Sequence, residues 1–390
     1  MIDRRSFAQG TLLSALLTGA ASAADQPSDV ALAFHFTAGS IWAPMLVERK
    51  GPYRFLLHTG QTFFVIGDSV AKSLGLRRRQ VPGLQVATHR GSVDLEIYVA
   101  HEVLLSDVYH MKEVEMMGRT YAIEDVYAGT FPFIPGMPTS FDFENNRMIF
   151  HTGEMNVPAG ATVFPLLHAQ APIISSVPVV HAELDGEPLK LIVNTGCASG
   201  LVLGPSAVRR LKLWDSHERY IKSVSYDPKD GLCESRTVRA RSFKLGAWEF
   251  QNPVVTLADP SNSLPRDLVY NDGSIGLDVL YRFAFGFDAK KSRAWFKPVG
   301  DIYGQPFMYN RSGFDMTCDA ANQWVVSALM PDGPADKAGL RLGDKLIWES
   351  DPQRVQQEYA LSGAAGAPVE VIVERGGKPQ NIRFVLEELI

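Results

Sequence analysis

Two short segments of this 390-residue sequence carry one pattern: an apolar run, a polar residue, then Thr-Gly. Residues 56–60 read LLHTG with His58 in the polar position, and residues 192–196 read IVNTG with Asn194 there. His58 could act as a general base, because the reference pKa of histidine is about 6.5. Asn194 has no titratable proton near neutral pH and can only donate and accept hydrogen bonds. Together they could position a water, but they lack a second acid–base group, whose contribution is typically about 10²–10⁴-fold in rate.

These segments belong to a longer internal duplication. Each is preceded by an apolar run and a turn, and followed by an apolar run, a short helix candidate and, later, a strand–turn–strand pattern. We expect Asp68 or Ser69 to cap the first helix and Pro205 to begin the second. The repeated unit is a whole small domain rather than a solenoid repeat. Short apolar runs broken by Gly, Pro, Asn and Asp predict mainly β structure. The paired segments are 43–52 and 177–186, 63–66 and 201–203, 69–74 and 205–211, and 133–150 and 274–296.

The duplicated pattern resembles the retropepsin/pepsin family of aspartic proteases. The family motif is an apolar strand followed by Asp-Thr-Gly, with a later apolar-apolar-Gly turn behind the active-site loop. Residues 275–278 (IGLD) match the later turn well, and residues 135–137 (PGM) match it more weakly. The resemblance covers roughly residues 40–297. It implies two closed β lobes in tandem, which we place at residues 24–157 and 158–300, with a linker near residues 157–160.

In this family two carboxylates share one proton, and the pair supplies both the acid and the base. The resemblance places His58 and Asn194 at these two positions, so the family mechanism should not operate and a pseudoprotease is expected. It also implies that the Thr59 and Thr195 hydroxyls brace the two loops by bonding across the axis. The Gly residues of the loops, Gly60 and Gly196, would allow the tight turns.

Other residues near these motifs have two interpretations each. Cys197 could be a nucleophile paired with His58, but we favour a small buried residue or half of a disulfide with Cys233. Three thiols, with Cys318 the third, is the alternative to a disulfide. Asp278 is interpreted as structural. Residues 88–91 and 226–231 are either flaps over the two lobes or ordinary hairpin tips.

The C-terminal segment, from about residue 301, has a different sequence pattern. Residues 330–340 predict a turn and a short helix that begins near Pro334 and stops at a glycine, and residues 369–386 predict a hairpin turning at Gly376. With the Gly-Asp at residues 343–344, this pattern resembles a PDZ domain of bacterial periplasmic proteases, which we place at residues 301–390. The resemblance implies a peptide-binding loop formed by Ser312, Gly313 and Phe314, which would hold a C-terminal carboxylate while the peptide adds as a strand.

Residues 1–23 are typical of an export signal. Arg4 and Arg5 precede an apolar stretch that ends in an Ala-Ser-Ala cleavage site, and the double arginine also fits a twin-arginine signal. We therefore expect a periplasmic or otherwise exported protein that uses the twin-arginine or the Sec route. Beyond the signal no apolar run approaches the ~20 residues of a membrane span.

The composition and the spacing of the histidines limit the kinds of partner and cofactor that the sequence supports. The net charge is −5 and no basic stripe is present, which disfavours nucleic-acid binding. The histidines lack metal-ligand spacing such as HExxH, so we expect no metal and no cofactor. Because the pseudo-twofold axis would be internal, we expect a monomer.

Three functions follow from these observations. The first is an exported aspartic-protease-fold protein, proteolytically impaired, that binds peptides or protein segments through an inter-lobe cleft and a PDZ domain, C-terminal tails included. The second is an active periplasmic peptidase that uses His58 and Asn194 in place of the Asp dyad, with Cys197 as a further candidate. The third is a structural envelope protein in which the space between His58 and Asn194 is closed.

Overall fold

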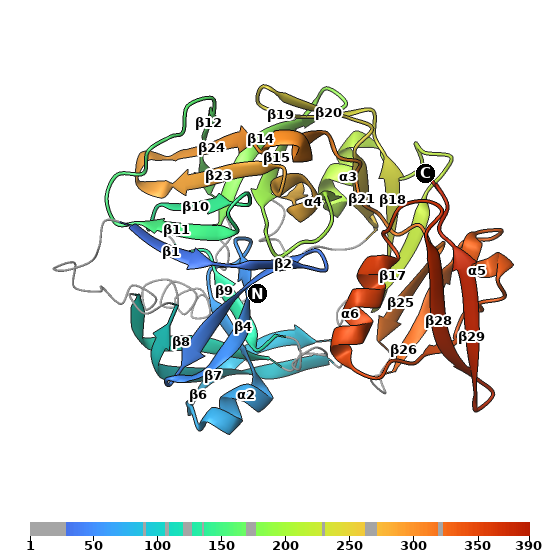
Figure 1. The fold of residues 1–390 in the computed structure, drawn as a ribbon, viewed down its shortest axis with the longest axis horizontal. Coiled ribbons are helices and arrows are strands. Elements are labelled where there is room, and N and C mark those ends of the chain that lie inside the picture. The colour runs from blue at the N-terminus through green and yellow to red at the C-terminus, as the bar shows by residue number, and fades with distance from the viewer. Residues whose placement is uncertain are drawn as a thin grey trace, which may run out of the picture.

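The computed structural model describes residues 29–88, 91–105, 109–119, 127–134, 136–168, 177–227, 231–261, 271–318 and 323–390. These residues form four β sheets and a few short helices, so the fold is mainly β, as the sequence predicts. Figure 1 shows the first sheet below, the second sheet above and the C-terminal sheet at the right. The predicted export signal lies outside the described residues.

The first and second sheets come from the two halves of the duplication. The first has the strand order β2 (His35–Thr37), β3 (Ser40–Val47), β4 (Lys50–His58), β9 (Gly129–Pro132), β5 (Phe64–Gly67), β8 (His110–Arg119), β7 (Gly91–Leu104) and β6 (Arg77–Thr88). The second has the order β17 (Ile221–Asp227), β18 (Gly231–Arg239), β21 (Val254–Ala258), β16 (Leu201–Leu203), β22 (Gly273–Ile275), β15 (Glu187–Val193), β14 (Pro178–Leu184), β19 (Ser242–Leu245) and β20 (Trp248–Gln251), with β13 (Leu167–His168) beside β14.

The two sheets share one strand pattern. In the first, β4 runs parallel to β9, β9 runs antiparallel to β5, and β5 runs parallel to β8. In the second, β15, β22, β16 and β21 repeat these directions in the same order. The helices α2 (Asp68–Leu74) and α3 (Pro205–Leu211) follow β5 and β16 at corresponding points. The folded chain therefore contains the duplication that the sequence predicts.

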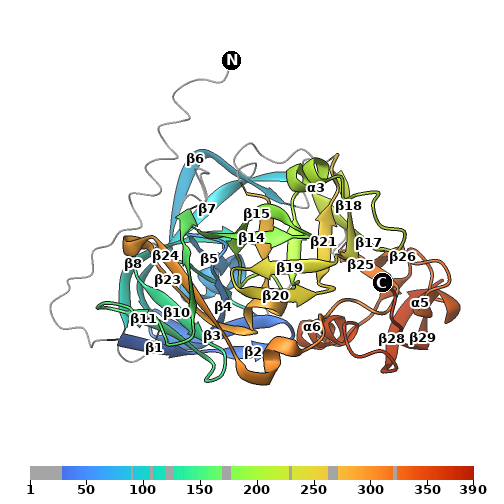
Figure 2. The same ribbon diagram turned by 90° about the horizontal axis from the view of Figure 1, so that it is seen from above.

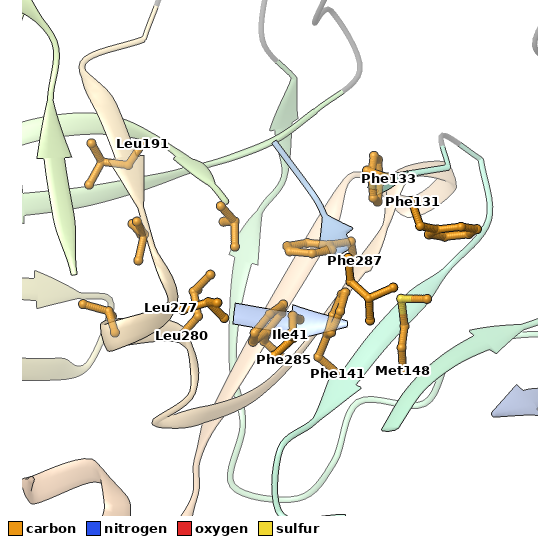
Figure 3. Packing of buried hydrophobic residues seen from close by; sticks show 14 of the residues in the cluster. Ile41, Phe131, Phe133, Phe141, Met148, Leu191, Leu277, Leu280, Phe285 and Phe287 are labelled. Carbon is orange, nitrogen blue, oxygen red and sulfur yellow. The ribbon is translucent and has the colours of Figure 1, made fainter. Parts of the chain in front are cut away.

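A bridging sheet joins the halves. Its order is β1 (Asp29–Ala33), β11 (Arg147–His151), β10 (Thr139–Asp142), β23 (Phe283–Asp288), β24 (Arg293–Pro298) and β12 (Thr162–Pro165). The hairpin that ends each half thus pairs with its counterpart, through β10 and β23. Phe141 and Phe285 stack at this seam with ring centroids 4.9 Å apart (Figure 3). The halves therefore share a sheet and one continuous buried core.

The C-terminal sheet has a core of its own. Its order is β25 (Phe314–Cys318), β26 (Trp324–Leu329), β27 (Lys345–Leu346), β28 (Pro368–Arg375) and β29 (Lys378–Val385), with helices α5 (Pro334–Lys337) and α6 (Asp351–Ala360). The predicted short helix at Pro334 and the hairpin at Gly376 are both present. Figure 2 shows this C-terminal part at the right, beside the second sheet. A short 3₁₀ segment, Gly300–Gly304, lies at the expected boundary.

Some local predictions are wrong in detail. The N-cap residue of α2 is Gly67 and no side chain caps the helix there, because Asp68 already lies in the first turn. The first hairpin turns at Glu48 and Arg49, which both have positive φ, and not at residues 50–52, where the sequence places a turn. Among the described residues, the remaining helices are α4 (Leu277–Leu280) and the 3₁₀ turn Ala289–Lys291. Over the described residues, no helix is long and apolar enough to cross a membrane.

Candidate functional site

The two Thr-Gly loops meet where β4 and β15 end. The backbone N–H of Thr59 donates to Oγ1 of Thr195, and the N–H of Thr195 donates to Oγ1 of Thr59, each at 3.0 Å. The Thr59 hydroxyl donates to the carbonyl of Val193 at 2.5 Å, and the Thr195 hydroxyl donates to the carbonyl of Leu57 at 2.7 Å. Both threonines are 2% exposed. We call these reciprocal bonds the threonine brace; it locks the two loops to each other.

The brace places His58 and Asn194 on opposite loops. A Cβ atom on Gly196 would lie 2.0 Å from Cδ2 of His58, so the imidazole packs directly on the glycine backbone. A Cβ atom on Gly60 would lie 2.7 Å from Cγ of Asn194, so the amide packs on the other glycine. The His58 side chain therefore lies on the loop that contains Asn194, and the Asn194 side chain lies on the loop that contains His58. A side chain at either glycine would displace the polar side chain that packs on it.

Hydrogen bonding fixes the amide. Oδ1 of Asn194 accepts the N–H of Gly196 at 2.9 Å, which leaves Nδ2 as the group able to donate elsewhere. The wall beside His58 is apolar: a small cavity there is lined mainly by Leu57, Phe131, Phe133, Ile134, Phe141, Met148 and Phe150. The pair presents one titratable group in place of two, because Asn194 does not titrate near neutral pH.

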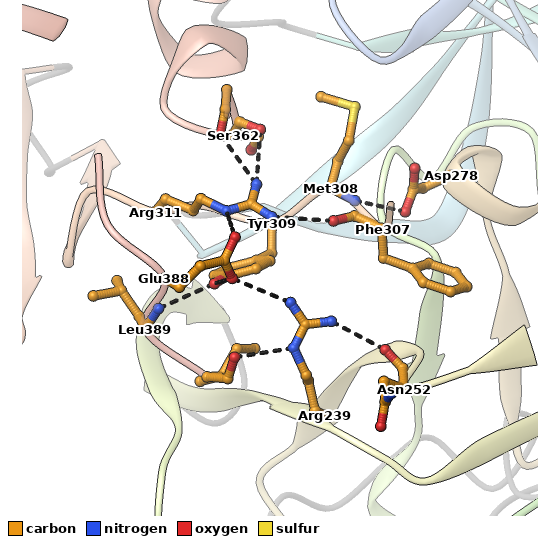
Figure 4. A network of polar contacts seen from close by, with 12 residues as sticks. Arg239, Asn252, Asp278, Phe307, Met308, Tyr309, Arg311, Ser362, Glu388 and Leu389 are labelled. Atoms are coloured by element: carbon orange, nitrogen blue, oxygen red, sulfur yellow. Dashed lines mark hydrogen bonds and ion pairs between the residues drawn. The ribbon is translucent and has the colours of Figure 1, made fainter. Parts of the chain in front are cut away.

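Asp278 lies close to these loops but belongs to a different network. Its Oδ2 accepts the N–H of Met308 at 3.0 Å, and its Oδ1 lies 3.4 Å from the guanidinium of Arg282 (Figure 4 shows the Met308 bond). Arg282 is fully buried and also donates to the carbonyls of Tyr303, Gln305 and Pro306. Burial raises the pKa of Asp278 to about 6, against the opposing charge of Arg282. This carboxylate therefore anchors the start of the C-terminal part, in line with its structural interpretation.

Cys197 follows the second loop as a half-buried thiol. Burial raises its pKa, although hydrogen bonds with Ser199 and Ser274 act in the opposite direction. Its Sγ is directed at Gly276, where an added Cβ would lie 3.1 Å away. All three cysteines are described, and none forms a disulfide. Of the two alternatives, the structure has the three thiols and not the Cys197–Cys233 disulfide.

The predicted peptide-binding loop is closed in this conformation. Ser312 and Phe314 are 0% and 1% exposed, and Gly313 is buried against Pro334. The N–H of Ser312 donates to Oδ1 of Asn310 at 2.9 Å, and the N–H of Phe314 donates to Oγ of Ser312 at 3.2 Å. A peptide carboxylate could bind these two amides only in place of those internal acceptors.

Both flap candidates are hairpin ends. The strands β6 and β7 pair up to Thr88 and Gly91, and β17 and β18 pair up to Asp227 and Gly231. The tips themselves, residues 89–90 and 228–230, lie outside the described residues. Their role as flaps stays a prediction.

Sequence comparison adds two findings. Residues 180–279 match the aspartyl protease family. That segment runs from β14 to α4 and includes Asn194, Thr195 and Gly196. The chain is also similar to a protein named probable periplasmic serine endoprotease DegP-like from Marinomonas sp. (strain MWYL1), with 33% identity over 105 residues, or 26% of this chain and 21% of that protein. The matched region is thus about a fifth of that relative. Both similarities are to proteases, so part of this chain has a protease-like sequence.

One contact near the site has no counterpart in the sequence patterns. The tip of the β2–β3 hairpin, at Gly39, lies between two other parts of the chain: a Cβ there would be 3.2 Å from Cβ of Ala198 and 3.5 Å from the ring of Tyr359. Ala198 belongs to the loop after Asn194, and Tyr359 is on α6. The C-terminal part therefore touches the neighbourhood of the site. The positive φ at Ala38 and Gly39 marks this turn, but nothing local identifies its partner.

Proposed function

We propose that this protein is an exported, proteolytically impaired member of the aspartic protease fold that binds peptides or protein segments. The observation that carries the proposal is the intact threonine brace around a pair, His58 and Asn194, that contains no carboxylate. The brace supports a site maintained in its geometry, while the pair cannot share a proton as two carboxylates do. The match of residues 180–279 to aspartyl proteases supports the fold assignment.

The proposal divides the chain as the sequence suggests. Residues 24–157 and 158–300 form two pepsin-like lobes, residues 301–390 form a PDZ-like domain, and residues 1–23 are an export signal. A bound peptide would lie across the loops of His58 and Asn194. The similarity to a protein named as a periplasmic protease supports export, and the PDZ-like domain would supply a second peptide site by strand addition. Two linked sites raise the effective concentration of one ligand segment at the other.

A second candidate, a peptidase, is favoured by one contact. The His58 imidazole packs against Gly196, close to where a water would lie between the two loops. A neutral imidazole there could act as a general base, and Nδ2 of Asn194 could donate to a developing oxyanion. This reaction would lack the second acid–base group, so we rank it below binding.

The test adds a methyl group at the glycine on which His58 packs. Mature protein carrying Gly196→Ala places a methyl group against His58, while Gly153→Ala adds one in open space and serves as the control. We expect capture of members of a random peptide library by the wild type and by the control, and at least about tenfold weaker capture by Gly196→Ala. Equal capture by all three proteins would place the peptide elsewhere and overturn the proposed site.

A further inference from the structure

A hairpin of the second sheet reaches over to the C-terminal sheet. The strand β17 lies against β25 and β26, and Figure 1 shows it running beside them near α6. In the order of hydrogen-bonded strands β25 is at the end of the C-terminal sheet, so one of its sides has no paired strand there. The strand that follows Ser312 and Gly313 is this same β25, next to which an added peptide strand would lie.

Specific polar contacts hold the hairpin in place. The carboxylate of Asp315, on β25, accepts hydrogen bonds from the side chain of Ser223 and from the backbone N–H of Val224. Oγ of Ser327, on β26, donates to the carbonyl of Val224 at 3.4 Å. Both backbone polar groups of Val224 are therefore satisfied by the C-terminal sheet. Side chains of β25 and β26 thus bond a segment of β17 as they could bond the backbone of a bound peptide.

The same hairpin leads back to the candidate site. The strand β18 pairs with β21, and β21 runs parallel to β16, which directly follows the loop of Asn194. On its other flank the C-terminal part touches that loop through Tyr359 and Gly39. A change in how the hairpin docks therefore acts on elements that border both sites.

We propose that the β17–β18 hairpin is an internal ligand of the C-terminal domain, occupying the surface beside β25 until a peptide displaces it. The occupant is a segment of this chain, and the competitor is an extended peptide that adds next to β25. Docking stands on the contacts above, whereas competition by peptide rests on the proposed function. Because the two bindings exclude each other, each weakens the other by the same factor.

Asp315 is surrounded by groups from β17, from α6 and from β25 itself. Burial raises its pKa to about 6, and Glu358 on α6, itself paired with Arg354, raises it further, against the hydrogen bonds from Met316, Ser223 and Val224. Lys222, next to Ser223 on β17, pairs with Glu234. The two groups of β17 that bond Asp315, Ser223 and Val224, lower its pKa, so these bonds favour the charged carboxylate.

The experiment measures backbone amide exchange of residues 221–227 in the full mature chain. For the wild type we expect protection of the Val224 amide, whose N–H is bonded to Asp315. The Asp315→Asn variant should weaken this protection, because a neutral amide oxygen replaces the charged acceptor. The Ser223→Ala/Ser327→Ala variant should lose it as well. The control Ser216→Ala removes a hydroxyl that bonds Leu213 away from this interface and should behave as the wild type.

Peptide capture tests the competition between hairpin and peptide separately from the docking of the hairpin. With the random peptide library as probe, Ser223→Ala/Ser327→Ala should capture more than the control. Unchanged amide exchange in that variant would overturn the docking. Altered exchange without any gain in capture would keep the docked hairpin but overturn its role as a competitor, and capture by no protein at all would count against the proposed function instead.

Discussion

Thr59 and Thr195 each donate a backbone N–H to the hydroxyl of the other, at 3.0 Å in both directions. The relationship is symmetric although the residues before them, His58 and Asn194, differ. The two halves of the chain have thus kept the same supporting geometry around unlike side chains. The chemistry of the pair depends on the His58 and Asn194 side chains. Their positions depend on the two threonines.

The brace makes a stability prediction. Thr195→Val keeps the shape but removes the hydroxyl, so the carbonyl of Leu57 and the N–H of Thr59 lose their partner in a buried site. We expect the free energy of unfolding to fall by about 2–4 kcal/mol. Chemical denaturation measures this. Thr256→Val is the control, since its hydroxyl lies 3.4 Å from that of Thr237 and should matter by less than about 1 kcal/mol. Equal losses in both variants would contradict a special role for the brace.

The buried Arg282 makes a second stability prediction. Arg282→Met removes the charge that faces Asp278 and leaves its carboxylate with the N–H of Met308 as donor. It also takes away the guanidinium bonds of the carbonyls of Tyr303, Gln305 and Pro306. We expect a loss of about 3–5 kcal/mol. The double variant with Asp278→Asn should recover part of that loss, because the uncompensated charge is gone. Thermal unfolding of the single and double variants measures the coupling. Strictly additive losses would show that the two residues do not interact.

Glu388 should make stability depend on acid. Burial opposes its ionisation, but hydrogen bonds from Tyr309 and Arg311 outweigh that effect and hold its pKa below its usual range (Figure 4). A lowered folded-state pKa contributes stability above the unfolded value, near 4.5, that is lost as pH falls through the folded one. Glu388→Gln should flatten this part of the pH–stability curve. The amplitude should be about 1 kcal/mol or less, since the carboxylate is half exposed and screened. An unchanged curve would contradict the assignment.

Cys197 should react slowly. Its burial and raised pKa keep the thiolate fraction at neutral pH below that of an ordinary exposed cysteine. Iodoacetamide labelling followed by mass spectrometry should therefore modify Cys197 at least about tenfold more slowly than free cysteine, and Cys197→Ala should leave peptide capture unchanged. Fast, selective labelling of Cys197 would reveal an activated nucleophile and favour a peptidase.

The duplicated framework could be predicted well from the sequence, because its signals are local. They are Thr-Gly after an apolar strand, Pro205 at a helix start and Gly376 in a hairpin. The contacts between distant segments could not be predicted from the sequence. The burial of Arg282 depends on the fold around it, and so does the meeting of Tyr359 with Gly39. The closed loop at Ser312 was missed for a related reason. A Ser-Gly-Phe pattern indicates a loop, but only folding shows that Asn310 already accepts its N–H bond.

The most direct test of the central claim is cleavage. Purified mature protein, His58→Ala and His58→Asp/Asn194→Asp would each be incubated with an unbiased peptide library from about pH 3 to about pH 8, with products read by mass spectrometry. We predict no cleavage by the wild type or by His58→Ala, and cleavage at acid pH by the double Asp variant, because two carboxylates on an intact brace restore the shared proton. Cleavage by the wild type that disappears in His58→Ala would contradict the account and identify His58 and Asn194 as a working active site.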